Sequence, residues 1–374
     1  MFITDSFNNQ IDDILVRICE KLQLTPTQYR LAEERYKSVG NWLHEKDSNL
    51  SQFSPDIYPQ GSLRIGTTVK PLIHQEFDLD LVCELHLDWQ QYNPINILNM
   101  VEQRLRLNSK YAPLVERKNR CIRLNYANEF HMDILPGAPN LQKGNGCLKV
   151  PDREAKEWKD SNPKGYAKWF EDQTIEYYEI LAKRLEPLPR PEKALDKAPL
   201  KRAVQLFKRF RDISFQKNPK IAPISIVLTT LVAESYRSQF SVNDTISAAL
   251  NDIIQRIPPV GHRLVVLNPT NCDEDLSERW EDDPELYKKF VEWINDFSRL
   301  WLELNVTKGI QNVSKLLEKM FGETVTMEAF REQAEIIEKA RKENVLSVSL
   351  PTGLITSNFG TKIIPIERNT FHGE

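Results

Sequence analysis

The feature that most constrains the fold is a run in which apolar and acidic residues alternate, FDLDLVCEL at residues 77–85. Phe77 and Leu79 alternate with Asp78 and Asp80, which is the period of a strand with one face in a core. Side chains at positions i and i+2 of a strand point to the same face, so the two carboxylates should aim at one place. Adjacent carboxylates repel unless a cation lies between them, and oxygen ligands without nearby His or Cys favour Mg²⁺, with Mn²⁺ as the alternative ion.

A third carboxylate, Asp133, lies in the segment FHMDILP, which the same alternation predicts to be a strand. Its neighbours Met132 and Ile134 are apolar, and a carboxylate in such a stretch needs a partner. Three acids on adjacent strands can hold two divalent ions, as in polymerase-type phosphoryl transfer. Each signal alone has a simpler interpretation, because D-x-D pairs are common on exposed strand faces and a single Asp can be structural.

The loop before the acidic strand, PQGSLRIGTTVKPL, adds a second signal. Gly61 can bring backbone close to a phosphate, and Ser62 can donate its hydroxyl and amide to phosphate oxygens. Gly-Ser alone is an ordinary turn. Placed sixteen residues before the D-x-D pair, with Asp133 on a later strand, it becomes part of a much more specific pattern.

The rest of the chain predicts an α+β protein with a mixed N-terminal part and a helical C-terminal part. Residues 5–47 should form two helices, the second capped by Thr25 and started by Pro26. Residues 137–165, rich in Gly, Asn, Pro and Lys, are expected to be a long insertion loop, and the proline-rich residues 187–199 a link. The remaining helices are expected at residues 94–107, 166–186, 200–216, 222–239, 242–256, 283–305, 309–320 and 326–343.

Composition excludes several classes of protein. The net charge of −3 rules out a polycation that binds nucleic acid over its whole surface. Five cysteines without paired spacing argue against a disulfide framework and against a C-x-x-C zinc site. With no apolar run of about 18 residues and no leader, we expect a cytoplasmic protein without a membrane partner.

One stretch is strongly basic. Between Lys183 and Lys220, twelve basic residues stand against four acids. Such a stretch could attract nucleotides or an activating nucleic acid, although a solvated helix face is the simpler interpretation.

These motifs together resemble the DNA polymerase β-type nucleotidyltransferases. More closely, the chain is similar to the bacterial cGAS/DncV-like nucleotidyltransferases, also called CD-NTases or SMODS domains. The resemblance covers about residues 10–320 and includes the segments VPDREAKEWKDSNPKGYAKWF, PISIVLTTLVAESY and LNPTNCDEDLSERW.

The resemblance implies a nucleotidyltransferase core with a small mixed sheet at residues 1–190, packed against a helical lobe at 191–345. Residues 346–374 would be a C-terminal tail. It also implies an enzyme that makes a cyclic di- or trinucleotide second messenger from NTPs, ATP among them, with release of pyrophosphate, in antiphage (CBASS) signalling. A downstream effector would read the product, and a regulatory or conjugating partner would act at the tail.

The resemblance also assigns roles to residues of this sequence. Two metal ions would be bound by Asp78 and Asp80, with Asp133 completing the site in the general-base position. The donor triphosphate would be held by Gln60, Gly61 and Ser62 in the loop, Lys208 in KRAVQLFKRFRD and Ser225 in APISIVLTT.

Some features of the site are left open by the sequence. The family often has an aromatic residue after the serine, but Ile226 stands here, so base stacking must come from elsewhere, such as Tyr236 or the 137–165 loop. His131 should share the face of Asp133 and is either a supporting group or structural. Trp280 is expected to pack in a core.

Two rival functions remain on sequence grounds. A template-independent transferase that modifies RNA or protein shares the Gly-Ser and carboxylate core, and would place labelled nucleotide on a macromolecule. A non-catalytic module that keeps the fold is disfavoured by the complete set of motif residues.

Overall fold

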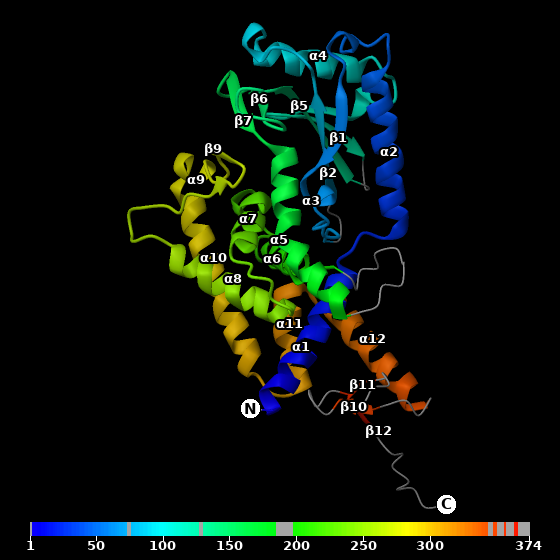
Figure 1. Ribbon diagram of the computed structural model, residues 1–374, viewed down its shortest axis with the longest axis vertical. Helices are drawn as coiled ribbons and strands as arrows, with labels where there is room; N and C mark the ends of the chain where they lie inside the picture. The colour runs from blue at the N-terminus through cyan, green and yellow to red at the C-terminus, as the bar shows by residue number, and fades with distance from the viewer. Residues whose placement is uncertain are drawn as a thin grey trace, which may run out of the picture.

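The computed structural model describes residues 2–72, 76–126, 130–184 and 197–342, and three short strands beyond them. Two lobes follow one another along the long axis, one built on a β-sheet and the other on helices (Figure 1). The α+β class and the small mixed sheet predicted from the sequence are confirmed.

The sheet lobe contains a seven-stranded sheet with the order β1-β2-β5-β4-β3, extended by β6 beside β5 and by β7 beside β6. Strands β2 and β5 are parallel, and the other pairs are antiparallel. The strands are β1 (Asp56–Gln60), β2 (Phe77–Glu84), β3 (Val115–Arg117), β4 (Ile122–Tyr126), β5 (Phe130–Pro139), β6 (Leu148–Asp152) and β7 (Glu157–Ser161).

The alternation in the sequence decides which face of this sheet is buried. Leu79 and Leu81 of β2 and Met132 of β5 cluster with apolar side chains of α2 (Pro26–His44) and α4 (Pro94–Arg106). The acidic residues between them therefore point to the other face. Thr25 caps α2 through a reciprocal capping box with Gln28, as the sequence predicts.

The helical lobe confirms the expected series of helices, with shifts of a few residues at their ends. The helices of this lobe are α1 (Phe2–Lys21), α5 (Pro163–Arg184), α6 (Pro199–Ser214), α7 (Ser225–Glu234), α8 (Val242–Arg256), α9 (Arg279–Asp282), α10 (Pro284–Val306), α11 (Ile310–Phe321) and α12 (Glu323–Lys342). A hairpin of β8 (Leu267–Asn268) and β9 (Asn271–Asp275) precedes α9. Trp280 of α9 is buried and stacks on Phe290, so its expected core role is confirmed.

The first helix packs in the helical lobe, far from the sheet-lobe helices that follow it in sequence (Figure 1). Leu15 and Ile18 of α1 lie in one apolar cluster with Phe170 of α5 and Leu206 of α6. The boundary expected at residue 190 would place α1 and α5 in the sheet lobe instead. Contacts between distant segments decide lobe membership, and helical periodicity carries no information about them.

The expectation of an insertion loop over residues 137–165 is wrong. Strand β5 continues to Pro139, β6 and β7 form a hairpin, and α5 begins at Pro163. β7 (EWKDS) lies at the edge of the sheet and has one apolar residue, Trp158, so it shows no apolar alternation. β6 (LKVPD) offers only Leu148 and Val150 at strand spacing, which is too short a period to identify a strand.

The last part of the chain is described only at β10 (Ser347–Ser349), β11 (Ile355–Thr356) and β12 (Ile363–Pro365), which form a small sheet. Most of the predicted proline-rich link and the terminal FHGE lie outside the described residues. Among the described helices none is long and apolar enough to cross a membrane. The five cysteines, which all lie in the described part, are free.

Candidate active site

Strand register brings the predicted carboxylates together. The parallel pairing of β2 with β5 sets Asp80 opposite Asp133 and Asp78 opposite His131. The antiparallel pairing of β4 with β5 sets Arg123 opposite Asp133. Three neighbouring strands therefore carry Asp80, Asp133 and Arg123 in one row on the face turned away from the apolar cluster.

The charge in this row is unbalanced. The pKa of Asp80 is raised from 3.8 to about 7, first by loss of hydration and then by repulsion from Asp78 and Asp133. Lys208 and Arg123 act in the opposite direction without cancelling the shift. Three carboxylates thus face too little positive charge, and a divalent cation is the group that would neutralise them.

This imbalance makes the stability of the metal-free protein depend on pH. A carboxyl with a raised pKa binds its proton more tightly in the folded state than in the unfolded chain. The stability that Asp80 contributes is therefore fully present below pH 3.8 and is lost as the pH rises through about 7. Melting curves in EDTA should show Asp80→Asn losing less stability than the parent over this range, by at most about 4 kcal/mol. If the melting temperatures of the two proteins changed with pH in parallel, the raised pKa of Asp80 would be contradicted.

The loop between β1 and β2 places the Gly-Ser motif against the carboxylates. Gln60, the last residue of β1, pairs with Asp80 across the strands, and Gly61 then starts the short helix α3 (Gly61–Arg64). Gly61 has φ +64°, and a Cβ there would lie 2.2 Å from Oδ2 of Asp80. Only glycine permits this close approach. The Ser62 hydroxyl shares a 3.2 Å hydrogen bond with that of Thr68.

The helical lobe supplies Lys208 and Ser225 to the same cleft. Lys208, on α6, is buried and donates to the carbonyl oxygen and Oγ1 of Thr67 at 3.2 and 3.0 Å. Burial, together with the charge of Arg211, lowers its pKa to about 7. Ser225 is the first residue of α7, and its hydroxyl accepts a hydrogen bond from Arg211.

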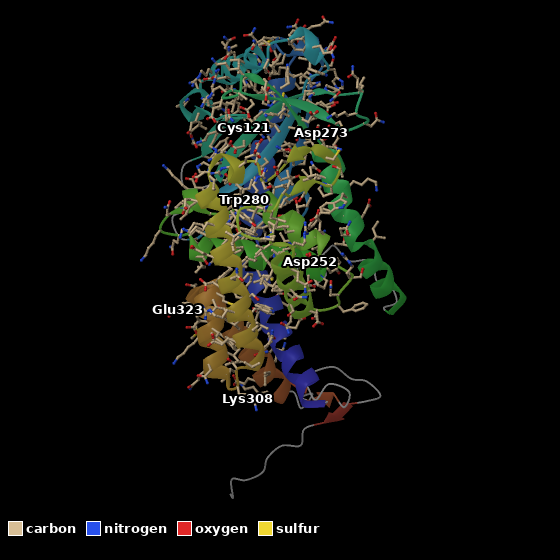
Figure 2. The ribbon with its side chains drawn as sticks, turned by 90° about the vertical axis from the view of Figure 1, so that its left-hand side faces the viewer. Cys121, Asp252, Asp273, Trp280, Lys308 and Glu323 are labelled. Atoms are coloured by element: carbon tan, nitrogen blue, oxygen red, sulfur yellow. The ribbon has the colours of Figure 1, made fainter. Side chains whose placement is uncertain are left out.

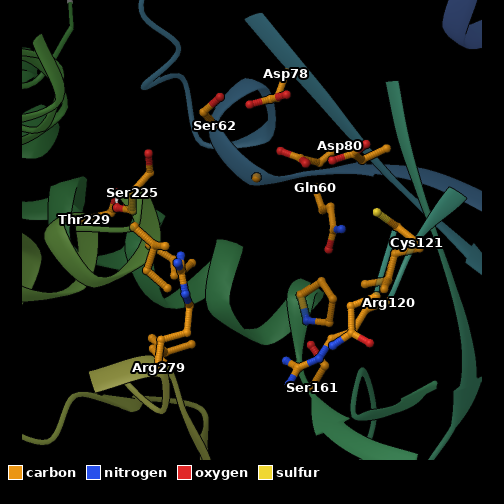
Figure 3. A pocket seen from close by; sticks show the side chains of 18 of the residues that line it. Gln60, Ser62, Asp78, Asp80, Arg120, Cys121, Ser161, Ser225, Thr229 and Arg279 are labelled. Atoms are coloured by element: carbon orange, nitrogen blue, oxygen red, sulfur yellow. Dashed lines mark hydrogen bonds between the residues drawn. The ribbon is translucent and has the colours of Figure 1, made fainter. Parts of the chain in front are cut away.

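All eight site residues predicted from the sequence line one cleft between the lobes. Seven of them have polar side chains, and the eighth, Gly61, has none. The cleft has a volume of ≈ 2020 Å³. In Figure 3, Asp78, Asp80 and Ser62 lie together on one side, and Ser225 and Thr229 lie across from them. Single-ligand pockets usually measure about 300–1,000 Å³, so this cleft has room for two nucleotides.

Ion pairs connect the two lobes beside the cleft. Arg120 in the β3–β4 turn binds Asp152 of the sheet lobe and Glu278 of the helical lobe. Lys143 pairs with Asp273 on β9. In Figure 2, Asp273 lies almost level with Cys121 along the long axis, which shows how far the β8–β9 hairpin reaches toward the sheet.

Two cations that contact predicted site residues, Arg123 and Arg211, were given no role in the site on sequence grounds. Arg123 is on the cleft face because Ile122 and Leu124 are buried, but its position opposite Asp133 depends on strand register. Arg211 lies three residues after Lys208 on α6 and therefore on the same face, so helical spacing could have found it.

Several other expectations have outcomes here. His131 does share the cleft face, with Nε2 2.7 Å from Glu76 and Nδ1 3.6 Å from Asp78. Tyr236 is buried and does not line the cleft. The basic stretch is not uniformly solvated, because Lys208 and Arg209 are buried.

The residues present fit a divalent cation. Asp78, Asp80 and Asp133 offer oxygen atoms only, which is the donor set that Mg²⁺ prefers. The raised pKa of Asp80 reports the positive charge that this donor set lacks. A second cluster, Asp56, Glu84 and His86, has ligand atoms within 4.8 Å of one another. Glu84 there already binds Tyr58 and Lys164, so the cleft is the better candidate.

Comparison with known proteins gives consistent matches. Residues 10–174 match the model of the Second Messenger Oligonucleotide or Dinucleotide Synthetase (SMODS) domain. The chain is 35% identical over 382 residues to a c-di-GMP synthase of Roseivirga ehrenbergii, with both chains covered completely. It is 26% identical over 307 residues to the cyclic dinucleotide synthase CdnG of Bradyrhizobium diazoefficiens, covering 74% of this chain and 72% of the other.

The fold has solved counterparts. The structure of the Bradyrhizobium diazoefficiens CD-NTase CdnG in complex with GTP superposes with a TM-score of 0.73 at 22% identity. The match covers 85% of this chain and 96% of that one. At this identity the likeness shows the fold, including the arrangement of a sheet lobe beside a helical lobe.

Proposed function

Because the chain belongs to the cGAS/DncV-like nucleotidyltransferases (CD-NTases), which make cyclic oligonucleotides from NTPs, we propose that it joins two GTP molecules into cyclic di-GMP. The full-length relative is a c-di-GMP synthase, which favours GTP over the ATP expected from the sequence alone. The antiphage signalling role is the one that the family implies.

The observation that carries this proposal is the row formed by Asp80 and Asp133 on paired strands, in a cleft with room for two nucleotides. In each step a ribose hydroxyl of one nucleotide would attack the α-phosphorus of the other. The new P–O bond forms as the bond to the β-phosphate breaks, and pyrophosphate leaves. A second step with the roles reversed closes the ring and releases a second pyrophosphate.

Each group at the cleft has a role in this proposal. Two Mg²⁺ ions held by Asp78, Asp80 and Asp133 would acidify the attacking hydroxyl and neutralise the leaving pyrophosphate. Asp133 would lie nearest the acceptor and would receive its proton. Gln60 and the Gly61-Ser62 backbone would hold the donor triphosphate from the sheet lobe. Across the cleft, Lys208 and Ser225 would hold it from the helical lobe.

The test is product analysis. The protein is incubated with each NTP alone and with all four, in Mg²⁺ and in EDTA, and the products are treated with phosphatase before mass spectrometry. We expect a phosphatase-resistant cyclic di-GMP from GTP alone, and none in EDTA. Linear products only would contradict cyclisation, and label on RNA or protein would favour the rival transferase.

The contribution of Lys208 can be tested separately. Lys208→Met keeps the length of the side chain and removes its charge, so KM for GTP should rise about tenfold, the worth of one charged hydrogen bond. Pyrophosphate release gives the initial rates. Lys217→Met, which removes an exposed charge outside the cleft, is the control and should leave KM unchanged. Equal KM values for all three proteins would exclude Lys208 from donor binding.

A further inference from the structure

Arg123 lies across two of the three carboxylates of the site. Its Nε and Nη2 donate to Oδ1 and Oδ2 of Asp133, both at 2.7 Å. The same Nη2 lies 3.2 Å from Oδ1 of Asp78. Both oxygens of Asp133, the residue proposed to serve the acceptor hydroxyl, are therefore already paired with a cation of the chain itself.

The backbone of Arg123 is fixed, whereas its side chain has room to leave. Residue 123 is in the middle of β4, paired with Asp133 on one side and Glu116 on the other. The Arg123 side chain is 19% exposed and lines the open cleft, so its guanidinium can rotate away without moving the sheet. Asp133 is similarly shielded at 17%, which strengthens the pair by limiting competition from water.

This pair competes directly with metal binding. A divalent ion bound to Asp133 would need the same carboxylate oxygens that accept hydrogen bonds from the guanidinium. The two positive charges would also repel each other. The carboxylates are also not gathered for an ion. Among the described residues, Asp56, Glu84 and His86 have ligand atoms that all lie within 4.8 Å of one another. Asp78, Asp80 and Asp133 do not form such a group, so at least two of these three carboxylates are farther apart than that.

We propose that Arg123 is a positioning residue that takes the place of a divalent ion at Asp133 in the nucleotide-free enzyme. Ion binding and the Arg123–Asp133 pair exclude each other, so the ion must displace the guanidinium before Asp133 can serve the reaction. The site is thus partly neutralised when empty and loads metal weakly until a nucleotide arrives. This inference rests on the proposed function, because it assumes that Asp133 binds metal.

The test measures Mn²⁺ affinity of the nucleotide-free protein by the EPR signal of free Mn²⁺, at about pH 8, above the pKa of Asp80. Arg123→Gln should bind Mn²⁺ at least about tenfold more tightly than the parent, since a charged pair is lost from the metal-free state. Arg123→Lys keeps the charge but not the two-pronged contact, so its affinity should lie between them.

Arg117→Gln is the matched control. Arg117, on the neighbouring strand β3, pairs with Glu102 and does not line the cleft, so its loss changes the net charge equally without touching Asp133. Its Mn²⁺ affinity should equal that of the parent. Melting curves in EDTA verify that each variant is folded.

The outcomes separate this inference from the proposed function. Tight Mn²⁺ binding by Arg123→Gln, together with weak or undetectable Mn²⁺ binding by the parent, supports the exchange of Arg123 for a metal ion. Equal affinities for the parent and Arg123→Gln, or weaker binding by the variant, overturn the exchange while leaving the metal site intact. If no variant binds Mn²⁺, both the exchange and the metal role of Asp133 are overturned.

Discussion

Asp80→Asn should lower the rate of product formation at least about a thousandfold, because a loss of about 4 kcal/mol in transition-state stabilisation is expected when a metal-binding charge is removed. The same change should raise the melting temperature of the metal-free protein at neutral pH. Asparagine has the shape of aspartate. Its neutral amide removes both the cost of burying a charge and the repulsion from Asp78 and Asp133, which together raise the pKa of Asp80. Activity and stability thus move in opposite directions.

Two measurements check this prediction. Mass spectrometry follows the rate of product formation, and melting curves with and without Mg²⁺ follow stability. The parent should gain stability from Mg²⁺, and Asp80→Asn should gain little. Asp172→Asn is the control, since Asp172 pairs with Lys168 on the surface of α5 and should leave both quantities near those of the parent. A variant at Asp80 that keeps substantial turnover would exclude this residue from the metal site.

Gly61→Ala should have the second largest effect, a loss of activity of at least about a hundredfold with a destabilisation of about 1–3 kcal/mol. The methyl group would lie 2.2 Å from Oδ2 of Asp80 and 3.0 Å from its Cγ, so the carboxylate or the loop must shift. A shift of this size moves the metal site and the donor loop relative to each other. The backbone at φ +64° adds strain for any residue with a Cβ.

Gly261→Ala separates backbone strain from the steric contact. Gly261 also has a positive φ, +97°, but a Cβ there meets nothing within 4 Å. It should lose stability without losing activity. The measurements are initial rates and melting temperatures of both variants. Full activity of Gly61→Ala would mean that the close contact with Asp80 has no part in catalysis.

The sequence was informative wherever a local period was strong. The alternation around Asp78 and Asp80 predicts the strand, its buried face and the shared direction of the two carboxylates, and β2 confirms all three. Most helices were also predicted within a few residues. The hairpin β6–β7 was missed because β6 has only two apolar residues at strand spacing and the edge strand β7 has only one apolar residue.

The sequence by itself determined which chemical groups the chain offers, namely carboxylates at strand spacing, a glycine loop before them and a lysine-bearing helix. Only the tertiary structure decided which groups meet. The parallel register of β2 and β5 sets Asp80 opposite Asp133, and the pairing of β4 with β5 adds Arg123, which no motif indicated. The packing of α6 brings Lys208 to the loop at Thr67. Local periods arise from neighbouring residues, whereas register and lobe packing depend on contacts between segments far apart in the chain.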